Sequence, residues 1–143
     1  SKEKIVFDIG AHIGLCSLPI SRALSKNGFC FSFEPVEENL KYMNSHLKMN
    51  NINNVKVIPH LVGDKPLENV DFFIHKVNSG MSSVCGSKNK LDMFEKVQKK
   101  QVTIDDFVYE HDCIPELIKI DVEGHEKEVI KGSGNIIKNQ KEN

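Results

Sequence analysis

The sequence has no long hydrophobic run and no excess of charge of either sign. No apolar stretch approaches the roughly 20 residues that a membrane-spanning helix needs, and the polar first residues lack the apolar core of a signal peptide. Its 19 basic and 20 acidic side chains leave a net charge of −1, whereas nucleic-acid binding is usually marked by a broad basic surface. These absences predict a cytoplasmic protein that binds neither nucleic acid nor a membrane.

Cysteine is present, but not in a metal-binding or redox pattern. The four cysteines are irregularly spaced and form no C-x-x-C pair, so the sequence suggests neither a zinc site nor a redox motif. The histidines show no metal-ligand spacing either. A chain of 143 residues with an ordinary apolar fraction of 39% is long enough for one modest core without disulfides. We therefore expect reduced, mostly buried thiols, no metal and a single domain over residues 1–143.

What the sequence does contain is an alternation of strands and helices. Short apolar runs at Ile5–Ile9 and Phe29–Phe33 predict buried strands, and a third strand is expected at residues 55–62. Between these strands, apolar residues spaced by three and four predict helices over residues 15–25 and 37–48. This order predicts an α/β fold with an open, mostly parallel sheet and helices on both of its faces.

The pattern changes after Gly63. We expect an insert of about residues 64–116 between the third and fourth parallel strands. Within this insert the sequence predicts strands at residues 70–75 and 101–104, separated by a polar loop and a short helical stretch near residues 91–96.

The alternation resumes in the last part of the chain. The segment that starts with Thr103 and has Asp106 three residues later resembles a capping box that opens a short helix. A strand at residues 117–121 is followed by a helix at Glu126–Lys131, which stops at a glycine.

A turn with two glycines follows the first strand. Asp8, Gly10 and Gly14 fall at the carboxyl end of that strand, where open parallel sheets bind their ligands. A dinucleotide-binding fingerprint, G-x-G-x-x-G, would need glycine in place of His12 and Leu15. The turn therefore predicts a nucleoside-like ligand that lacks a pyrophosphate here. The simpler alternative is a turn that only joins a strand to a helix.

Acidic residues end two other predicted strands. Glu34 ends the second strand, 20 residues past Gly14, where a carboxylate can accept hydrogen bonds from both hydroxyls of a ribose. Its alternative role is a charge favoured by the N-terminus of the next helix. Asp121 and Glu123 follow the strand at residues 117–121 and project at the same edge of the sheet. Capping of the next helix is the alternative role of Asp121.

These motifs carry a family resemblance. "VFDIGAHIG", "FSFEP", "SGMSS", "VTIDDF" and "LIKIDVEGHEKEVIKG" occur in an order that resembles FkbM-type methyltransferases, over roughly residues 5–132. The resemblance implies a class I, Rossmann-like methyltransferase fold with S-adenosylmethionine as the cofactor. It also implies an O-methyltransferase that acts on the hydroxyl of a sugar or another small molecule.

The resemblance also implies site residues, position by position. Glu34 would hold the ribose, and residues 61–64 would border the adenine. The loop at residues 78–83 would approach the methyl acceptor. The cofactor-binding residues implied in this way are Asp8, Gly10, Ala11, Gly14, Glu34, Pro35, Leu61 and Asp121. The candidate bases for removing the proton of an acceptor hydroxyl are Asp121, Glu123 and His125.

One departure from the family pattern concerns the end of the chain. Class I methyltransferase sheets normally add further strands after the helix Glu126–Lys131, but only about ten mostly polar residues follow Gly132 here. The resemblance therefore implies a sheet truncated at its C-terminal strands, so that the strand at residues 117–121 lies near an edge. We expect a fragment of a longer chain, or an edge that the inserted strands or a partner such as a second copy cover.

Three hypotheses of function follow. The first is a small-molecule O-methyltransferase, and the second is a non-catalytic cofactor-binding or assembly module left by truncation. The third, a dinucleotide oxidoreductase, is disfavoured because His12 and Leu15 replace glycines of its fingerprint.

Overall fold

The computed structural model describes residues 4–77, 82, 84 and 93–139 of the chain. By its internal contacts the chain forms two compact units, which are described separately below: Ser1–Pro59 with Cys113–Asp121, and His60–Asp112 with Val122–Asn143. Within the described ranges, no helix is both long enough and apolar enough to cross a membrane. The expected single domain over residues 1–143 stays a prediction.

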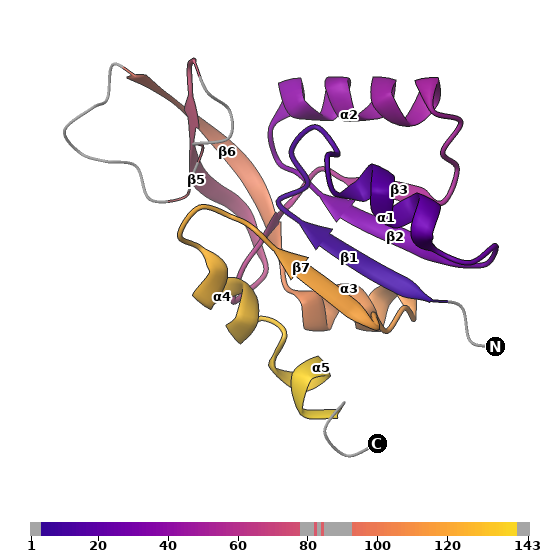
Figure 1. Cartoon of the computed structure of the whole chain (residues 1–143). Helices are drawn as coiled ribbons and strands as arrows, with labels where there is room; N and C mark the ends of the chain where they lie inside the picture. The colour runs from indigo at the N-terminus through magenta and orange to yellow at the C-terminus, as the bar shows by residue number, and fades with distance from the viewer. Residues whose placement is uncertain (1–3, 78–81, 83, 85–92, 140–143) are drawn as a thin grey trace. The chain divides into compact units, whose positions relative to one another are not determined.

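The first unit is built around a parallel sheet of four strands (Figure 1). The strands lie in the order β3-β2-β1-β7; they are β1 (Ile5–Ile9), β2 (Phe29–Phe33), β3 (Val55–Ile58) and β7 (Leu117–Ile120). β1 is paired in parallel with β2 on one side and with β7 on the other. The carboxyl ends of these three strands therefore meet at one edge, and the predicted parallel sheet is confirmed.

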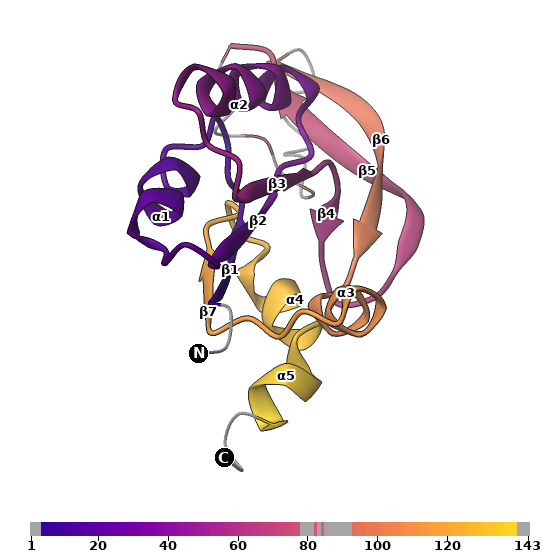
Figure 2. The ribbon, with the colours of Figure 1, turned by 90° about the vertical axis from the view of Figure 1, so that its right-hand side faces the viewer.

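Two helices cover one face of this sheet (Figure 2). α1 (Ser17–Ala23) begins two residues before Pro19, which is tolerated because a proline in the first helical turn removes no intrahelical hydrogen bond. In α2 (Glu37–Met49), Met43 and Leu47 are buried against Ala11 from the turn after β1. The spacing of apolar residues in the sequence predicted this inner face of α2, because helical residues three and four apart share a side.

The opposite face of the sheet carries aromatic rings. Phe7 on β1 contacts Phe31 and Phe33 on β2 edge to face, with ring centroids 5.6 and 5.7 Å apart. Phe7 and Phe33 are fully buried. Because side chains alternate along a strand, Asp8 and its register partner Ser32 point to the side covered by the helices.

The second unit contains a three-stranded sheet in the order β4-β6-β5 (Figure 2). Its strands are β4 (Leu61–Val62), β5 (Leu67–His75) and β6 (Phe94–Val102), and its helices are α3 (Ile104–His111), α4 (Glu126–Lys131) and α5 (Gly134–Asn139). The hydroxyl of Thr103 accepts the N–H of Asp106 at 3.0 Å, which confirms the predicted start of α3. The carboxylate of Asp105 accepts the N–H groups of Asn135 and Ile136, so it holds the first turn of α5 to α3.

Two predicted elements differ in part from the structure. The strand expected at residues 55–62 is interrupted, because β3 ends at Ile58 and β4 belongs to the other sheet; Pro59 lies at the break and has no N–H for a ladder hydrogen bond. The helical stretch expected near residues 91–96 is a strand from Phe94 onward, because β6 pairs with β5 there and pairing overrides local preference. Residues 91–92, and residues 78–81 and 83 of the expected acceptor loop, lie outside the described residues.

Candidate functional site

The turn between β1 and α1 is tied by its backbone to the end of β2. The N–H groups of Gly10 and Ala11 both donate to the carbonyl oxygen of Phe33, each at 3.0 Å. Gly10 and Gly14 have φ angles of 76° and 90°, a left-handed region in which glycine avoids the strain of a Cβ. The turn therefore bends over the end of β2, next to Glu34.

Glu34 follows β2 with its carboxylate buried beside the turn. Its Oε2 accepts the N–H of His12 at 2.8 Å, and its Oε1 accepts the N–H of Val36 at 2.8 Å and the amide of Asn39 at 3.1 Å. Burial raises the pKa of this carboxyl above its ordinary 4.5, although the three hydrogen bonds act to lower it. A carboxylate has about four acceptor positions, so a hydroxyl donor can still be accommodated.

Asp8 lies in β1, just before the same turn, and has no exposed surface. Its Oδ2 accepts the hydroxyl of Ser17 at 2.6 Å, and the Ser17 oxygen lies 2.8 Å from that of Ser32. Its Oδ1 forms an ion pair with Nζ of Lys119 at 2.9 Å. One oxygen of Asp8 thus accepts a hydrogen bond, and the charge of the other is compensated by the ion pair with Lys119. The predicted contact of Asp8 with a cofactor stays a prediction.

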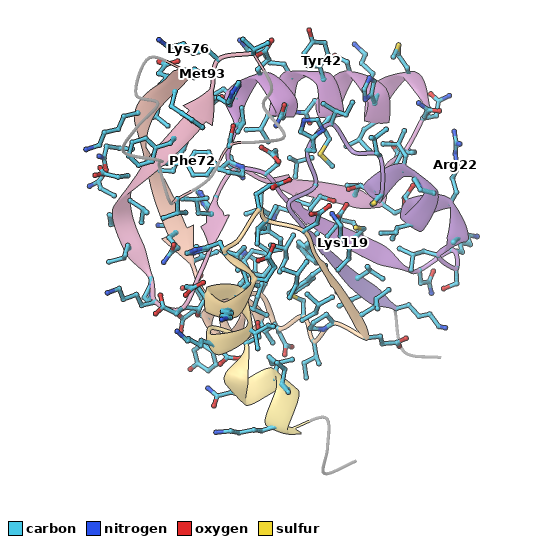
Figure 3. The ribbon with its side chains drawn as sticks, turned by 60° about the vertical axis from the view of Figure 1, so that its left-hand side comes forward. Arg22, Tyr42, Phe72, Lys76, Met93 and Lys119 are labelled. Atoms are coloured by element: carbon cyan, nitrogen blue, oxygen red, sulfur yellow. The ribbon has the colours of Figure 1, made fainter. Side chains whose placement is uncertain are left out.

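Lys119 is the functional candidate that sequence reasoning missed (Figure 3). Its ammonium donates to the carbonyl oxygen of Gly10 at 3.0 Å and lies 4.0 Å from Oδ2 of Asp121. A signal was present in the sequence, because Asp8 and Lys119 are opposite charges inside two apolar strands. Recognising it required knowing that β1 and β7 are neighbours in this register.

Asp121 lies at the same edge, directly after β7. Its N–H donates to the carbonyl of Ile9 at 3.0 Å, and its side chain is 72% exposed. The first unit therefore brings Asp121, the turn and Glu34 together at one edge of the sheet, with Pro35 half-buried next to Glu34.

The other predicted site residues belong to the second unit. Leu61 was expected beside an adenine at the end of the third parallel strand, but it is buried in β4, a strand of the other sheet. Glu123 is exposed, with a φ of 46°. His125 is the residue before α4, its side chain is 14% exposed, and its Nδ1 lies 3.7 Å from Oε2 of Glu128. The roles of Leu61, Glu123 and His125 stay predictions.

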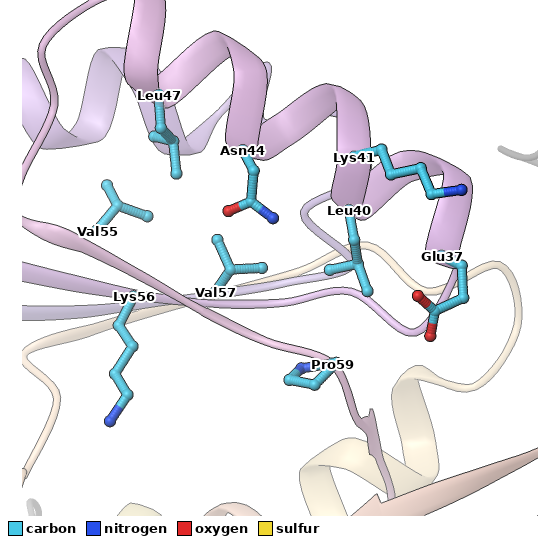
Figure 4. Close-up of a pocket in the computed structure, with 9 residues that line it drawn as sticks. All are labelled: Glu37, Leu40, Lys41, Asn44, Leu47, Val55, Lys56, Val57 and Pro59. Carbon is cyan, nitrogen blue, oxygen red and sulfur yellow. The ribbon is translucent and has the colours of Figure 1, made fainter.

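A groove of about 470 Å³ lies elsewhere in the first unit, between α2 and β3 (Figure 4). Leu40 and Leu47 of α2 point toward Val55 and Val57 of β3, while Lys56 points away from the helix. The groove shares no residue with the predicted cofactor site.

The parallel sheet, the glycine turn and the acidic residue after β2 define a Rossmann-like α/β protein. The family model of the methyltransferase FkbM domain matches residues 8–143. The chain therefore belongs to the FkbM methyltransferase domain family, as its motifs predicted.

One solved structure has the same fold over nearly the whole chain. The methyltransferase FkbM of Methylobacillus flagellatus KT matches with a TM-score of 0.66 and 23% identity, over 98% of this chain and 31% of that one. The chain thus spans about a third of the length of that protein. Two further matches cover less of the chain. A putative methyltransferase of Streptococcus mutans in complex with SAH has a TM-score of 0.38 and 26% identity, over 43% of this chain and 33% of that one. A SAM-dependent methyltransferase of Aquifex aeolicus has a TM-score of 0.41 and 23% identity, over 48% of this chain and 37% of that one. A search of curated proteins gave no match.

Proposed function

We propose that the chain binds S-adenosylmethionine at the carboxyl edge of β1, β2 and β7, and that it serves the O-methylation of a small-molecule or sugar hydroxyl. The observation that carries this proposal is the buried carboxylate of Glu34, which the N–H of His12 ties to the glycine turn at 2.8 Å. Membership of the FkbM methyltransferase domain family supports the same reading.

In this proposal different residues around the turn contact different parts of the cofactor. Glu34 accepts a hydrogen bond from a ribose hydroxyl, because it is a carboxylate beside the turn with acceptor capacity left. Gly10, Ala11 and Gly14 border the methionine part of the cofactor, where the absence of large side chains permits close approach of the backbone. Pro35, next to Glu34, borders the nucleoside part of the cofactor.

The chemistry asked of the protein itself is modest. S-adenosylmethionine supplies a methyl group that is already activated by its sulfonium, so the protein has to position the acceptor oxygen and exclude water. The hydroxyl of the acceptor must also lose its proton. Asp121 is our first candidate for this base, because its exposed carboxylate stands at the edge beside the turn. Glu123 and His125, which follow Asp121 closely in the chain, are the other candidate bases.

Calorimetry tests the binding step. We expect wild-type protein to bind S-adenosylmethionine and S-adenosylhomocysteine, and Glu34→Ala to bind both at least about 10-fold more weakly, since a hydrogen bond to a charged group contributes roughly 1.5–3 kcal/mol. Glu38→Ala removes an exposed glutamate of α2 and is the matched control, with unchanged affinity. Preferential binding of NADH, or equal binding by Glu34→Ala and wild type, contradicts the proposal.

Transfer of a labelled methyl group tests the reaction. Incubation with a pool of hydroxylated metabolites should label a product, and Asp121→Asn should lower the rate more than the affinity for the cofactor. Tight cofactor binding without any transfer would instead support the second hypothesis, a non-catalytic cofactor-binding or assembly module.

A further inference from the structure

We propose that Lys119 is a positioning residue for the cofactor, because it clamps the peptide group between Gly10 and Ala11 in the orientation that the binding turn needs. This inference rests on the proposed function of the same edge. It concerns a side chain that lies outside the glycine turn and outside the acidic strand ends.

The strand register brings Lys119 to this place. β7 pairs with β1 so that Lys119 stands opposite Asp8, and the two side chains share the sheet face on which α1 and α2 pack. The ammonium then reaches past the end of β1 to the carbonyl of Gly10, at 3.0 Å. The side chain of Lys119 is only 26% exposed, so its position is constrained by packing as well as by its partners.

The peptide group that follows Gly10 is held from both of its ends. Its carbonyl oxygen, on Gly10, accepts from Lys119 of β7, and its N–H, on Ala11, donates to the carbonyl of Phe33 of β2. Gly10 has a φ of 76°, and glycine adopts several other backbone conformations at little cost. With one of the two hydrogen bonds removed, this peptide group is held at one end only. The clamp therefore fixes the backbone that lines the proposed cofactor site.

Lys119 has a second role, which can be separated from the first. It is the ion-pair partner of the fully buried Asp8, and removing one member of such a pair leaves a buried charge without compensation. Loss of Lys119 therefore lowers stability through Asp8 and loosens the turn through Gly10. In a chain that lacks Lys119, also replacing Asp8 by asparagine removes the uncompensated charge but leaves the carbonyl of Gly10 without its donor.

The test uses four variants of the full chain: Lys119→Met, Asp8→Asn, the double variant Asp8→Asn/Lys119→Met, and Lys56→Met as the control. Lys56 is an exposed lysine in a strand of the same sheet and points away from α2. Urea unfolding gives stability, and calorimetry gives the affinity for S-adenosylhomocysteine.

We expect Lys119→Met to be less stable than wild type and to bind S-adenosylhomocysteine at least about 10-fold more weakly, the effect of losing about 1.4 kcal/mol. The double variant should recover much of the stability but keep the weak binding. Asp8→Asn, which retains the donor to Gly10, should bind more tightly than the double variant, and Lys56→Met should match wild type. Affinity that recovers together with stability in the double variant overturns the inference, because Lys119 is then only a counterion.

Amide hydrogen exchange gives a readout that needs no ligand. The N–H of Ala11 should exchange faster in Lys119→Met and in the double variant than in wild type, and unchanged exchange in both overturns the clamp. Wild-type protein that fails to bind S-adenosylhomocysteine contradicts the proposed function and this inference together. Wild type that binds it, with Lys119→Met binding equally well, overturns this inference alone.

Discussion

Glu34 carries a buried carboxylate whose ionisation opposes folding. The side chain is 4% exposed, and burial is the largest effect on its pKa, which is raised. The N–H groups of His12 and Val36 and the amide of Asn39 only partly offset this effect. A buried carboxyl group with a shifted pKa lowers the stability of the folded protein, and functional sites commonly contain such groups.

The raised pKa of Glu34 predicts how stability changes with pH. Because the folded-state pKa lies above the unfolded value of 4.5, this group stabilises the folded state at pH below 4.5. That contribution is lost as the pH rises through the folded-state pKa. Glutamine at this position cannot ionise. The free energy of unfolding of Glu34→Gln, minus that of wild type, should therefore increase between about pH 4 and about pH 7.

Urea unfolding at a series of pH values measures this difference, and Glu38→Gln is the comparison for removing a carboxyl group from the exposed side of α2. The sign of the change with pH is the prediction, since glutamine also alters the hydrogen bonds from His12 and Val36 at every pH. A difference that decreases as the pH rises would mean that the folded protein favours the ionised form of Glu34.

At the scale of elements, the turn between β1 and α1 is shaped by packing as much as by a ligand. Gly14 has a φ of 90°, and a Cβ added there would lie 2.9 Å from Cδ1 of Leu18 and 3.2 Å from Cγ of Met43. Its missing side chain is what lets the turn, α1 and α2 come together. Glycine at this position of the motif is thus explained without any ligand.

Gly14→Ala should therefore lower the free energy of unfolding by about 1–3 kcal/mol, through both backbone strain and the contacts with Leu18 and Met43. Thermal or urea unfolding measures the loss. Gly134→Ala is the matched control, because Gly134 begins a helix and no heavy atom lies within 4 Å of an added Cβ. That variant should be as stable as wild type or slightly more stable. Equal stability of the two variants would contradict the packing argument.

Elements governed by local rules could be predicted from the sequence. β1 and β2 are buried on both faces and read as short apolar runs, and α4 was predicted with the bounds that the structure has. The cap of α3 was predicted because Thr103 and Asp106 are three residues apart.

β3 and β6 were missed in part, because their bounds depend on which sheet each segment joins. Lys119 was missed for the same reason, since its partners Asp8 and Gly10 are close to it only in the folded sheet.

At the scale of the whole molecule, the first unit is discontinuous in the sequence. The chain leaves this unit after Pro59 and returns at Cys113 to add β7 beside β1. β7 contributes Lys119, and the clamp on the turn therefore forms only when segments more than 100 residues apart have met. Such long-range pairing makes the site a property of the complete sheet rather than of its N-terminal motif.

A chain ended after Asp112 should therefore lose cooperative folding. It lacks β7, so β1 gains an unpaired edge, and the fully buried Asp8 loses its ion-pair partner. Loss of one member of a buried pair alone costs about 3–5 kcal/mol, a large part of the stability of an ordinary domain. Urea unfolding followed by circular dichroism should show a broad transition or none.

The full-length Asp8→Asn/Lys119→Met variant separates the two causes, because it lacks the charges but retains β7. We expect it to unfold cooperatively, with the sheet order β3-β2-β1-β7 intact, whereas the shortened chain does not. If the shortened chain unfolded as sharply and at the same urea concentration as the full chain, β7 would be dispensable for the sheet. In that case β1 and β2 would form the turn without β7, and Lys119 would not be needed for its folding.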